Sequence, residues 1–270
     1  MQINADARWK RVRVASDLHL HKDDPQTAAH WHSLLRDDDA DAWFLLGDYF
    51  EVWVGDDLLD APGRLPASSA PGESNEDEAS IAFWQHCAEQ LQRLSARKPV
   101  YWLSGNRDFL VGDTFAQRTG VTLLSDPVVL QWGPSRRLLS HGDQWCTSDR
   151  EYMAFRARVR HPEWQQTFLA QPLSARLTQA KAMREQSQAR QQARSDWTDV
   201  TASAVAEAAE RMQATEVIHG HTHEGKSHGL GAIQRHVLSD WHLNASPPRW
   251  SIIELTQDRT VWLNATSSGG

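Results

Sequence analysis

The sequence has few cysteines and no long apolar run. Its 270 residues include two cysteines, Cys87 and Cys146, which lie far apart in the chain. Two separated cysteines cannot build the disulfide framework of a small secreted domain, and they suit a reducing compartment. No run approaches the ~18 apolar residues of a membrane span, and the N-terminal segment has no apolar signal-peptide core. We therefore expect a protein that is neither secreted nor membrane-spanning, in which the glycosylation-type matches at Asn244 and Asn264 occur by chance.

A general excess of basic charge is also absent. The formal net charge is −7 at pH 7, with 28 Lys and Arg against 35 Asp and Glu, which argues against a nucleic-acid binder. The segment from Arg150 to Arg194 departs from this balance, because it holds nine basic and three acidic residues. This local excess is either a solvated face or a surface for the anionic leaflet of a membrane, where each basic residue contributes roughly 1 kcal/mol.

The order of apolar and polar segments predicts an α/β fold. Short β-rich runs alternate with helical stretches near 26–37 and 79–97. The expected strands are 10–16, 42–47, 99–105, 136–142, 215–220, 235–240, 250–256 and 260–265.

The domain organisation follows from changes in composition. Residues 150–212 are rich in Gln, Ala and Arg, and predict a helical insert between a core formed by 1–149 and 213–264. We expect a flexible surface loop at 61–80 and a frayed tail at 265–270. The insert carries an apolar stripe at helical spacing, which either packs on the core or lines an acyl chamber. Its members are Trp164, Phe168, Leu169, Leu173 and Leu177.

Five of the expected strands end in side chains that can bind a metal ion. These are, in chain order, Asp17 with His19, then Asp48, Asn106, His141, and His221 with His223. A single Asp or Asn after a strand is typical of a turn or a helix cap. Functional sites of α/β folds, however, collect at the carboxyl ends of strands. The series therefore predicts a metal site built from these seven side chains.

The types of ligand indicate the chemistry of that site. Oxygen and imidazole donors without cysteine suit Mn²⁺, Fe²⁺ or Zn²⁺. Seven side chains are too many for one tetrahedral ion, but they suffice for two ions if one carboxylate bridges. Two such ions, ~3.5–4 Å apart, hold the attacking and leaving oxygens of a displacement at phosphorus and acidify bound water. The pattern predicts metal-assisted hydrolysis of a phosphoester or phosphoanhydride.

The words "DLH", "GDYFE", "GNRDF", "HGD" and "GHTH" occur in this order between residues 17 and 223. They resemble the motifs of the calcineurin-like metallophosphoesterase family, which implies two β-sheets flanked by helices. The resemblance implies one metal held by Asp17, His19, Asp48 and His223. It implies a second metal held by Asp48, Asn106, His141 and His221, with Asp48 bridging. His219 precedes the last motif, and we expect it to be a packed or hydrogen-bonded strand residue.

Arg107 stands where this family usually has histidine. Arginine stays charged, so it cannot protonate a poor leaving group, but it can stabilise charge on a phosphoryl group. This favours a leaving group that needs no proton, such as the phosphate of a pyrophosphate substrate. The catalytic residues are accordingly predicted to be Arg107, Asp48 and Asn106. A structural ion pair between Arg107 and Asp108 is the alternative.

Longer stretches of sequence around these motifs resemble a particular group within the family. "SDLHL", "GDYFEVWVGDD", "GNRDFLVG", "HGDQWCTSDREYMAFR" and "IHGHTHEG" closely resemble the bacterial UDP-2,3-diacylglucosamine pyrophosphatases of lipid A biosynthesis. The resemblance implies water attack at the phosphorus next to uridine, which gives UMP and 2,3-diacylglucosamine 1-phosphate. It also implies two Mn²⁺ ions and a peripheral position on the cytoplasmic face of the inner membrane. The insert would cap the acyl chains, and no obligate protein partner is expected.

The same resemblance implies a set of substrate-binding residues. Matching positions are Asn106, Arg107, Asp149, Ser187 and His221. Two positions depart from the family pattern, with Gln191 in place of Asn and Arg194 in place of Lys, and both changes keep polarity or charge. Tyr152 and Phe155 lie about one helical turn apart, and we expect them to contact the acyl chains or the sugar.

Two other functions remain open. One is a dinuclear phosphodiesterase or pyrophosphatase with a soluble nucleotide substrate, and the helical insert argues against it. The other is a protein-interaction scaffold, which should have lost metal ligands, whereas all seven are present. Asp108 and Asp143 either orient the neighbouring ligands or cap turns.

Overall fold

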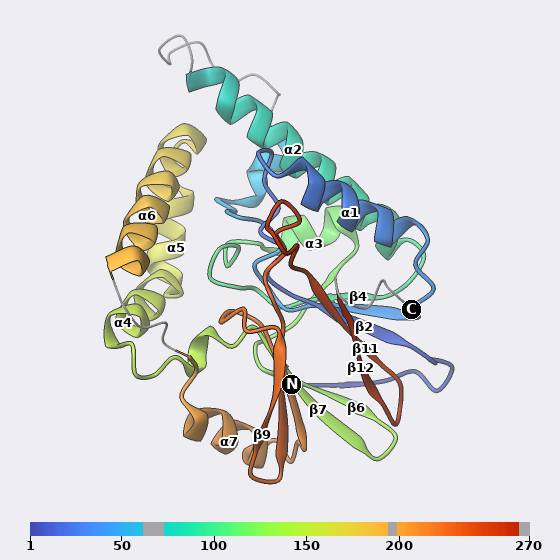
Figure 1. Ribbon diagram of the computed structural model, residues 1–270. Helices are drawn as coiled ribbons and strands as arrows, with labels where there is room; N and C mark the ends of the chain where they lie inside the picture. The colour runs from blue at the N-terminus through green and yellow to red at the C-terminus, as the bar shows by residue number, and fades with distance from the viewer. Residues whose placement is uncertain (62–72, 194–198, 265–270) are drawn as a thin grey trace.

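The structure is a computed structural model that describes residues 1–61, 73–193 and 199–264. Within these residues the chain forms two six-stranded sheets packed face to face, with helices on the outside (Figure 1). The sheet called here the β3 sheet has the order β12-β11-β2-β3-β4-β5, and the sheet called the β8 sheet has the order β1-β6-β7-β8-β10-β9. This arrangement confirms the predicted α/β sandwich.

The strands include the eight expected ones and four others. The β3 sheet contains β12 (Thr260–Asn264), β11 (Ser251–Leu255), β2 (Val12–Ala15), β3 (Ala42–Leu45), β4 (Val100–Trp102) and β5 (Thr122–Leu123). The β8 sheet contains β1 (Gln2–Asn4), β6 (Val128–Trp132), β7 (Ser135–Ser140), β8 (Glu216–His219), β10 (Ile233–Val237) and β9 (Lys226–Leu230). The strands that sequence analysis missed are β1, β5, β6 and β9.

Parallel pairing brings the ends of the important strands together. β2, β3 and β4 run parallel in the β3 sheet, so their carboxyl ends lie at one edge. β7 and β8 run parallel in the β8 sheet, with Leu138 opposite Val217. The polar residues that follow these five strands therefore emerge on the same side of the sandwich, as the strand-end pattern predicts.

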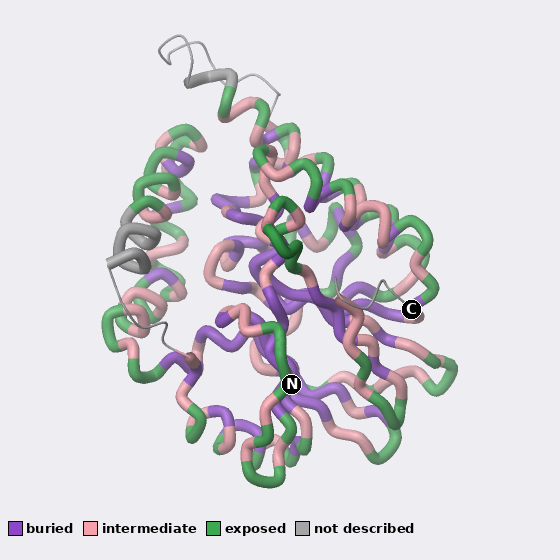
Figure 2. The backbone as a smooth tube through the Cα atoms, in the orientation of Figure 1, coloured by how far each residue is buried: buried purple, intermediate pink, exposed green. Residues whose placement is uncertain are grey.

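The core between the sheets fixes their relative position. Val14 and Phe44 of the β3 sheet pack with Leu139 and Ile218 of the β8 sheet, and all four side chains are fully buried. Alternate residues of each strand point into this layer, as expected for two sheets with their faces in contact. The central strands β2, β3, β7 and β8 are more deeply buried than the outer strands β1, β9 and β12 (Figure 2).

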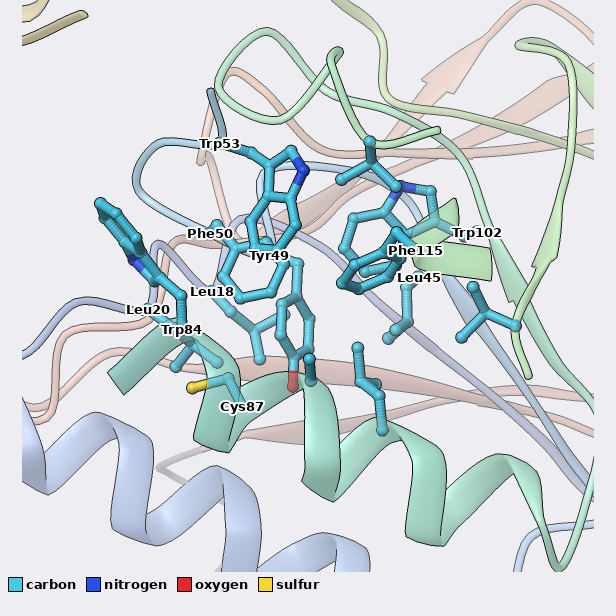
Figure 3. Close-up of a cluster of buried hydrophobic side chains, with 14 of the residues drawn as sticks. Leu18, Leu20, Leu45, Tyr49, Phe50, Trp53, Trp84, Cys87, Trp102 and Phe115 are labelled. Carbon is cyan, nitrogen blue, oxygen red and sulfur yellow. The ribbon is translucent and has the colours of Figure 1, made fainter. Parts of the chain in front are cut away.

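A second core lies between the β3 sheet and its outer helices, α1 (Pro25–Arg36), α2 (Glu73–Ser95) and α3 (Asp113–Thr119). Figure 3 shows its aromatic centre, where Tyr49, Phe50 and Trp53 meet Trp102 and Phe115. Among the described tryptophans, four have a relative exposure of 1% or less, which agrees with a packing role. They are Trp31, Trp43, Trp53 and Trp102. The Asp24 side chain caps α1 by accepting from the Thr27 N–H.

The described residues of the predicted insert form four helices, of which three lie together at one side of the molecule (Figure 1). These are α4 (Arg150–Val159), α5 (Pro162–Leu169) and α6 (Leu173–Ala193). The fourth, α7 (Ala202–Arg211), packs on the outer face of the β8 sheet through Val205, Ala208 and Ala209. The boundary at residue 212 is therefore corrected: helicity was predicted, but α7 is an outer layer of the core, as its apolar face requires.

Part of the apolar stripe packs against the core. Phe168 and Leu177 are buried within the cluster that also contains Trp53 and Val54, whereas Leu169 is 41% exposed. Of the two interpretations of the stripe, the structure therefore shows packing.

Two further predictions concern less regular segments. The loop predicted at 61–80 is wrong in its last part, because α2 begins at Glu73 and its acidic first turns are helical. Residues 62–72 and the predicted tail at 265–270 lie outside the described residues. Short 3₁₀ helices at Asp56–Asp60 and Asp143–Trp145 complete the fold. Cys87 and Cys146 are buried free thiols.

Candidate metal centre

The backbone is strained where the predicted ligands lie. Six non-glycine residues of the described chain have positive φ angles, and five of them are predicted metal ligands. These five are Asp17, His19, Asp48, His221 and His223, with φ between 48° and 66°. Non-glycine residues seldom adopt this conformation, and it is concentrated at functional sites. The strand-end loops thus direct side chains toward one point at the expense of local backbone stability.

Two glycines of the motifs allow these loops to approach one another. A Cβ atom on Gly105 would overlap the Asp48 carboxylate, and one on Gly220 would overlap the carboxylate of Asp17. Any side chain at these positions would push apart the loops that follow different strands. The glycines of "GNRDF" and "GHTH" are therefore required by the close contact of backbone and carboxylate.

One group of predicted ligands gathers around Asp17. His223 Nε2 lies 3.2 Å from Asp17 Oδ1 and 3.4 Å from His19 Nε2. The ligand atoms of Asp17, His19 and His223 all lie within 4.8 Å of one another. Two imidazoles and a carboxylate at this spacing form a suitable site for a divalent cation.

A second group gathers around Asn106. Its Oδ1 lies 3.0 Å from His141 Nε2 and 2.8 Å from His221 Nδ1. Asp48 lies between the two groups, with Oδ2 3.9 Å from His19 Nε2 and Oδ1 3.8 Å from His141 Nε2. The ligand atoms of Asp17, Asp48 and His141 also lie within 4.8 Å of one another, so Asp17 is close to His141 of the second group as well. Both carboxylates are therefore close enough to both groups to act between them.

The charges of the site favour a bound cation. Burial opposes protonation of His141, but the Asp48 and Asp17 carboxylates raise its pKa to about 9. Burial likewise opposes protonation of His19, but Glu51, Asp48 and Asp17 raise its pKa to about 9. The carboxylates thus attract positive charge to the points where the imidazole nitrogens converge. Burial, with His141 beside it, lowers the pKa of His221 to about 3, which keeps this ring in the neutral form that binds metal.

His219 differs from its two neighbours, as predicted. It is the last residue of β8 and is fully buried, its Nδ1–H donates to the carbonyl of Gly220 at 2.8 Å, and its ring packs on Trp145. Burial lowers its pKa to about 4. The strand ends here, so alternation of side chains ends with it, and only His221 and His223 turn toward the carboxylates.

Both the backbone and the side chain of Arg107 contact neighbouring residues. Its backbone N–H donates to Asp48 Oδ1 at 2.8 Å, and its carbonyl accepts from the Trp53 N–H at 3.0 Å. Its guanidinium faces Glu51, with Nη1 3.6 Å from Oε1. The alternative ion pair with Asp108 is not the contact found here, because the Asp108 carboxylate accepts from the backbone N–H groups of Gly105 and Tyr49 at 2.7 and 2.8 Å.

Asp108 and Asp143, which lie beside candidate ligands, have different contacts. Asp108 holds together the loops that follow β3 and β4, through the backbone bonds just described, and does not orient an imidazole. Asp143 accepts from the Tyr152 hydroxyl and from Arg156 Nε, both at 2.8 Å, and so connects α4 to the core. Both acids position the backbone around the ligands.

Sequence analysis missed most of the contacts between the insert and the core. Arg160 Nη2 donates to the Gly105 carbonyl at 2.8 Å, beside Asn106 and Arg107. Arg176, almost fully buried, donates to Val54 O and pairs with Asp57. Arg184 Nε lies 2.9 Å from Glu51 Oε1. The basic excess of this segment is thus partly used to hold α4 and α6 against the site.

The remaining predicted substrate residues are placed as follows. The Asp149 side chain caps α4 by accepting from the Tyr152 N–H at 3.0 Å. The Tyr152 ring lies 5.5 Å from the His221 ring, close to the second group of ligands. Phe155 is half-buried and carries the Arg158 guanidinium over its ring. The side chains of Ser187, Gln191 and Arg194 lie outside the described residues, although the backbone of α6 extends to Ala193.

A cavity of about 430 Å³ opens beside the first group of ligands. Arg107, Arg184 and Glu51 line it, and Trp241 is the one apolar residue of its wall among the described residues. The other lining residues are His19, His21, Asp23, Asp24, His223, Asp240, His242 and Asn244. This volume suits a small polar molecule or part of a larger one.

The sequence of this chain is similar to those of several known proteins. The family described as calcineurin-like phosphoesterase matches residues 10–225. A UDP-2,3-diacylglucosamine hydrolase from Bordetella pertussis is 39% identical over 251 residues, which cover 89% of this chain and 90% of that protein. Enzymes of the same name from Cellvibrio japonicus and Coxiella burnetii are 40% and 37% identical, over 84% and 87% of this chain and 89% and 91% of theirs. A solved archaeal phosphodiesterase aligns over 94% of this chain and 98% of its own at 11% identity, with a TM-score of 0.46.

Proposed function

Since this chain belongs to the calcineurin-like phosphoesterase family, we propose that it hydrolyses the pyrophosphate bond of UDP-2,3-diacylglucosamine in lipid A biosynthesis. Water attacks the phosphorus next to uridine, and the products are UMP and 2,3-diacylglucosamine 1-phosphate. The relatives at 37–40% identity, which carry the name of this hydrolase, support the substrate. The observation that carries the reaction type is the convergence of seven strand-end side chains, five of them on strained backbone.

The residues fit a pair of Mn²⁺ ions. Asp17, His19, Asp48 and His223 would hold one, and Asp48, Asn106, His141 and His221 would hold the other. The donor set of carboxylates, imidazoles and an amide oxygen, without thiolates, suits Mn²⁺ and also tolerates other divalent ions. Such ions, when bound, supply positive charge to the phosphoryl oxygens and lower the pKa of water.

The chain's own groups would act around this centre. Asp48 and Trp53 fix the backbone of Arg107, and Glu51 faces its guanidinium, so this group is already placed beside the ligands before it meets the phosphoryl group. It would stabilise the charge that develops on the leaving phosphate, which needs no proton. Asn106 and His221 would contact the substrate from the ligand side, and Asp149, Ser187, Gln191 and Arg194 from the insert. Tyr152, beside His221, would contact the sugar, and Phe155 an acyl chain.

One observation favours a second candidate, a soluble nucleotide substrate. The cavity beside the ligands has polar walls apart from Trp241, and Phe168 and Leu177 of the stripe pack into the core cluster. A phosphodiesterase or pyrophosphatase without acyl chains in its substrate would use the same metal centre and would need no apolar chamber.

The proposed location is the cytoplasmic side of the bacterial inner membrane, with peripheral binding to anionic lipid. The described residues include no helix that is both long enough and apolar enough to cross a bilayer. Arg150, Arg158 and Lys181 are exposed on the insert and remain for contact with lipid, whereas Arg156, Arg160, Arg176 and Arg184 reach the core.

A pair of substrates tests the proposal. The protein is freed of metal, Mn²⁺ is added back, and release of UMP is measured from UDP-2,3-diacylglucosamine and from UDP-N-acetylglucosamine. Metal-dependent release from the acylated substrate alone is the expected result. Equal or faster release from the unacylated substrate would favour the second candidate, and no release from either would reject both.

A further inference from the structure

Glu51 is a buried carboxylate that contacts three different parts of the site. It directly follows the short bridge between Leu20 and Phe50, and its backbone N–H donates to the carbonyl of Leu20 at 3.2 Å. Its side chain is about 9% exposed. Burial raises the free energy of a charged carboxylate, and the guanidinium groups of Arg107 and Arg184, with nitrogens 3.6 and 2.9 Å from Oε1, offset this cost. Glu51 therefore carries its charge inside the protein because cationic groups surround it.

The first contact is with His19. Glu51 Oε2 lies 2.9 Å from His19 Nδ1, a close contact in which the N–H bond does not point directly at the oxygen, while His19 Nε2 faces Asp17, Asp48 and His223. A carboxylate beside Nδ1 favours the tautomer with its proton on that nitrogen. The lone pair is then on Nε2, which is the atom that faces the other ligands. Glu51 thus orients the ring and sets which nitrogen is free to bind metal.

The second and third contacts are with two arginines. Glu51 Oε1 lies 2.9 Å from Arg184 Nε on α6 and 3.6 Å from Arg107 Nη1 in the loop after β4. The N–H bond of Arg184 does not point directly at the oxygen, so the contact is an ion pair rather than an aligned hydrogen bond. One oxygen thus holds two like charges near each other, and the two guanidinium groups would repel without it.

We propose that Glu51 is a positioning residue that couples the insert to the metal centre. Through the negative charge on Oε2 it favours the metal-binding tautomer of His19. Through Oε1 it keeps α6 next to Arg107, which is predicted to meet the phosphoryl group. Arg107 and α6 therefore move together. This inference rests on the proposed role of His19 as a metal ligand, but not on the identity of the substrate.

The test compares Glu51→Gln with the wild-type protein. The substitution keeps the shape of the side chain and removes its charge. Mn²⁺ affinity is measured by calorimetry without substrate, and amide exchange of residues 173–185 is followed by mass spectrometry. We expect Mn²⁺ binding at one site to weaken by about 10–100-fold, the effect of losing a carboxylate behind a ligating histidine. We expect exchange in α6 to accelerate roughly fivefold, as for the loss of one ion pair of ordinary strength.

Glu216→Gln is the matched control. Glu216 Oε2 pairs with the buried Arg137 at 2.9 Å, on the β8 sheet and remote from the ligands. A general effect of removing a paired carboxylate would appear in both variants. Unchanged Mn²⁺ affinity in Glu51→Gln, or an equal loss in Glu216→Gln, overturns the assignment to His19. Unchanged exchange in α6 overturns the coupling to the insert.

Arg184→Gln separates the two parts if Glu51→Gln does not fold. Arg184 is 40% exposed, so its loss should leave the core intact. Exchange in α6 should accelerate while Mn²⁺ binding stays within about twofold of wild type, because His19 keeps its contact with Glu51. Slow exchange in this variant contradicts the coupling. A wild-type protein that binds no Mn²⁺ would instead refute the proposed metal centre itself.

Discussion

The two sheets bring different chemistry to the candidate metal centre. Loops that follow strands of the β3 sheet supply both carboxylates, Asp17 and Asp48, together with Asn106 and one imidazole, His19. Loops that follow strands of the β8 sheet supply only imidazoles, from His141, His221 and His223. The first sheet therefore provides the negative charge that attracts cations, and the second provides nitrogen donors. Neither sheet contains a complete site, so packing between the sheets positions the ligands.

The largest effect should come from the β3 sheet. Asp48→Ala removes the carboxylate whose oxygens lie 3.9 Å from His19 and 3.8 Å from His141, and it also frees the Arg107 backbone. We expect turnover to fall by more than about 10³-fold, beyond the usual effect of removing one transition-state donor. Turnover is measured at saturating Mn²⁺. Turnover close to wild type would contradict a bridging role for Asp48.

A matched pair tests the imidazoles of the β8 sheet. His221→Ala should reduce turnover by about 10³-fold and lower the bound metal, because it removes a ligand next to Asn106. His219→Ala, two residues earlier, should keep its metal and lose stability by about 1–3 kcal/mol, because it removes a buried, packed ring. Metal analysis and denaturant unfolding of both variants distinguish the roles. The reverse pattern would mean that the two histidines are wrongly assigned.

Arg107 tests whether the arginine serves the substrate or the metal. Arg107→Ala should lower kcat by about 10²-fold, the effect of losing one charge-stabilising group, with Mn²⁺ affinity nearly unchanged. Arg107→Lys keeps the charge without the two-pronged geometry and should recover part of the rate. Kinetics and Mn²⁺ titration are performed on both variants. A loss of metal that accounts for the loss of rate would assign Arg107 to the metal centre.

A smaller effect should follow from changes between the insert and the core. Arg176→Gln leaves the carbonyls of Val54 and Gln171 without their donor. It should lower the free energy of unfolding by about 1–3 kcal/mol, which is less than for a fully buried ion pair because the partner, Asp57, is exposed. Arg150→Gln changes the same type of residue on the exposed face and should stay within about 0.5 kcal/mol of wild type. Equal losses in urea unfolding would contradict the special role of Arg176.

The smallest effect concerns the proposed membrane surface. Lys181→Gln should weaken binding to vesicles that contain anionic lipid about fivefold, which corresponds to roughly 1 kcal/mol. Binding to neutral vesicles should not change. Equal binding of wild type and variant to anionic vesicles would show that this face of α6 does not meet lipid.

The convergence of the candidate ligands could be predicted because each of them follows directly from its local sequence. Asp17, Asp48, Asn106 and His141 each follow an apolar run, and parallel pairing brings such ends to one edge without further information. The separation of His219 from His221 was also predictable, since the glycine between them ends the strand. The strained φ angles at the ligands were not visible in the pattern, but they agree with it, because functional loops are where such strain is found.

The contacts across the molecule could not be predicted in the same way. Glu51 meets Arg184 through the packing of α6, and no spacing in the sequence relates the two positions. The helicity of α7 was evident, but its apolar face fits either a lid or an outer layer of the core. The strands β1 and β5 have three and two residues, too few for alternation to appear.

The metal content of the protein tests the central claim most directly. The wild-type protein is equilibrated with Mn²⁺, freed of unbound ion and analysed for metal per chain, with His221→Ala alongside. Two ions per wild-type chain and a lower content in the variant are the predicted result. One ion or none in the wild type, or equal contents in the two proteins, would contradict a dinuclear centre built from the strand ends of both sheets.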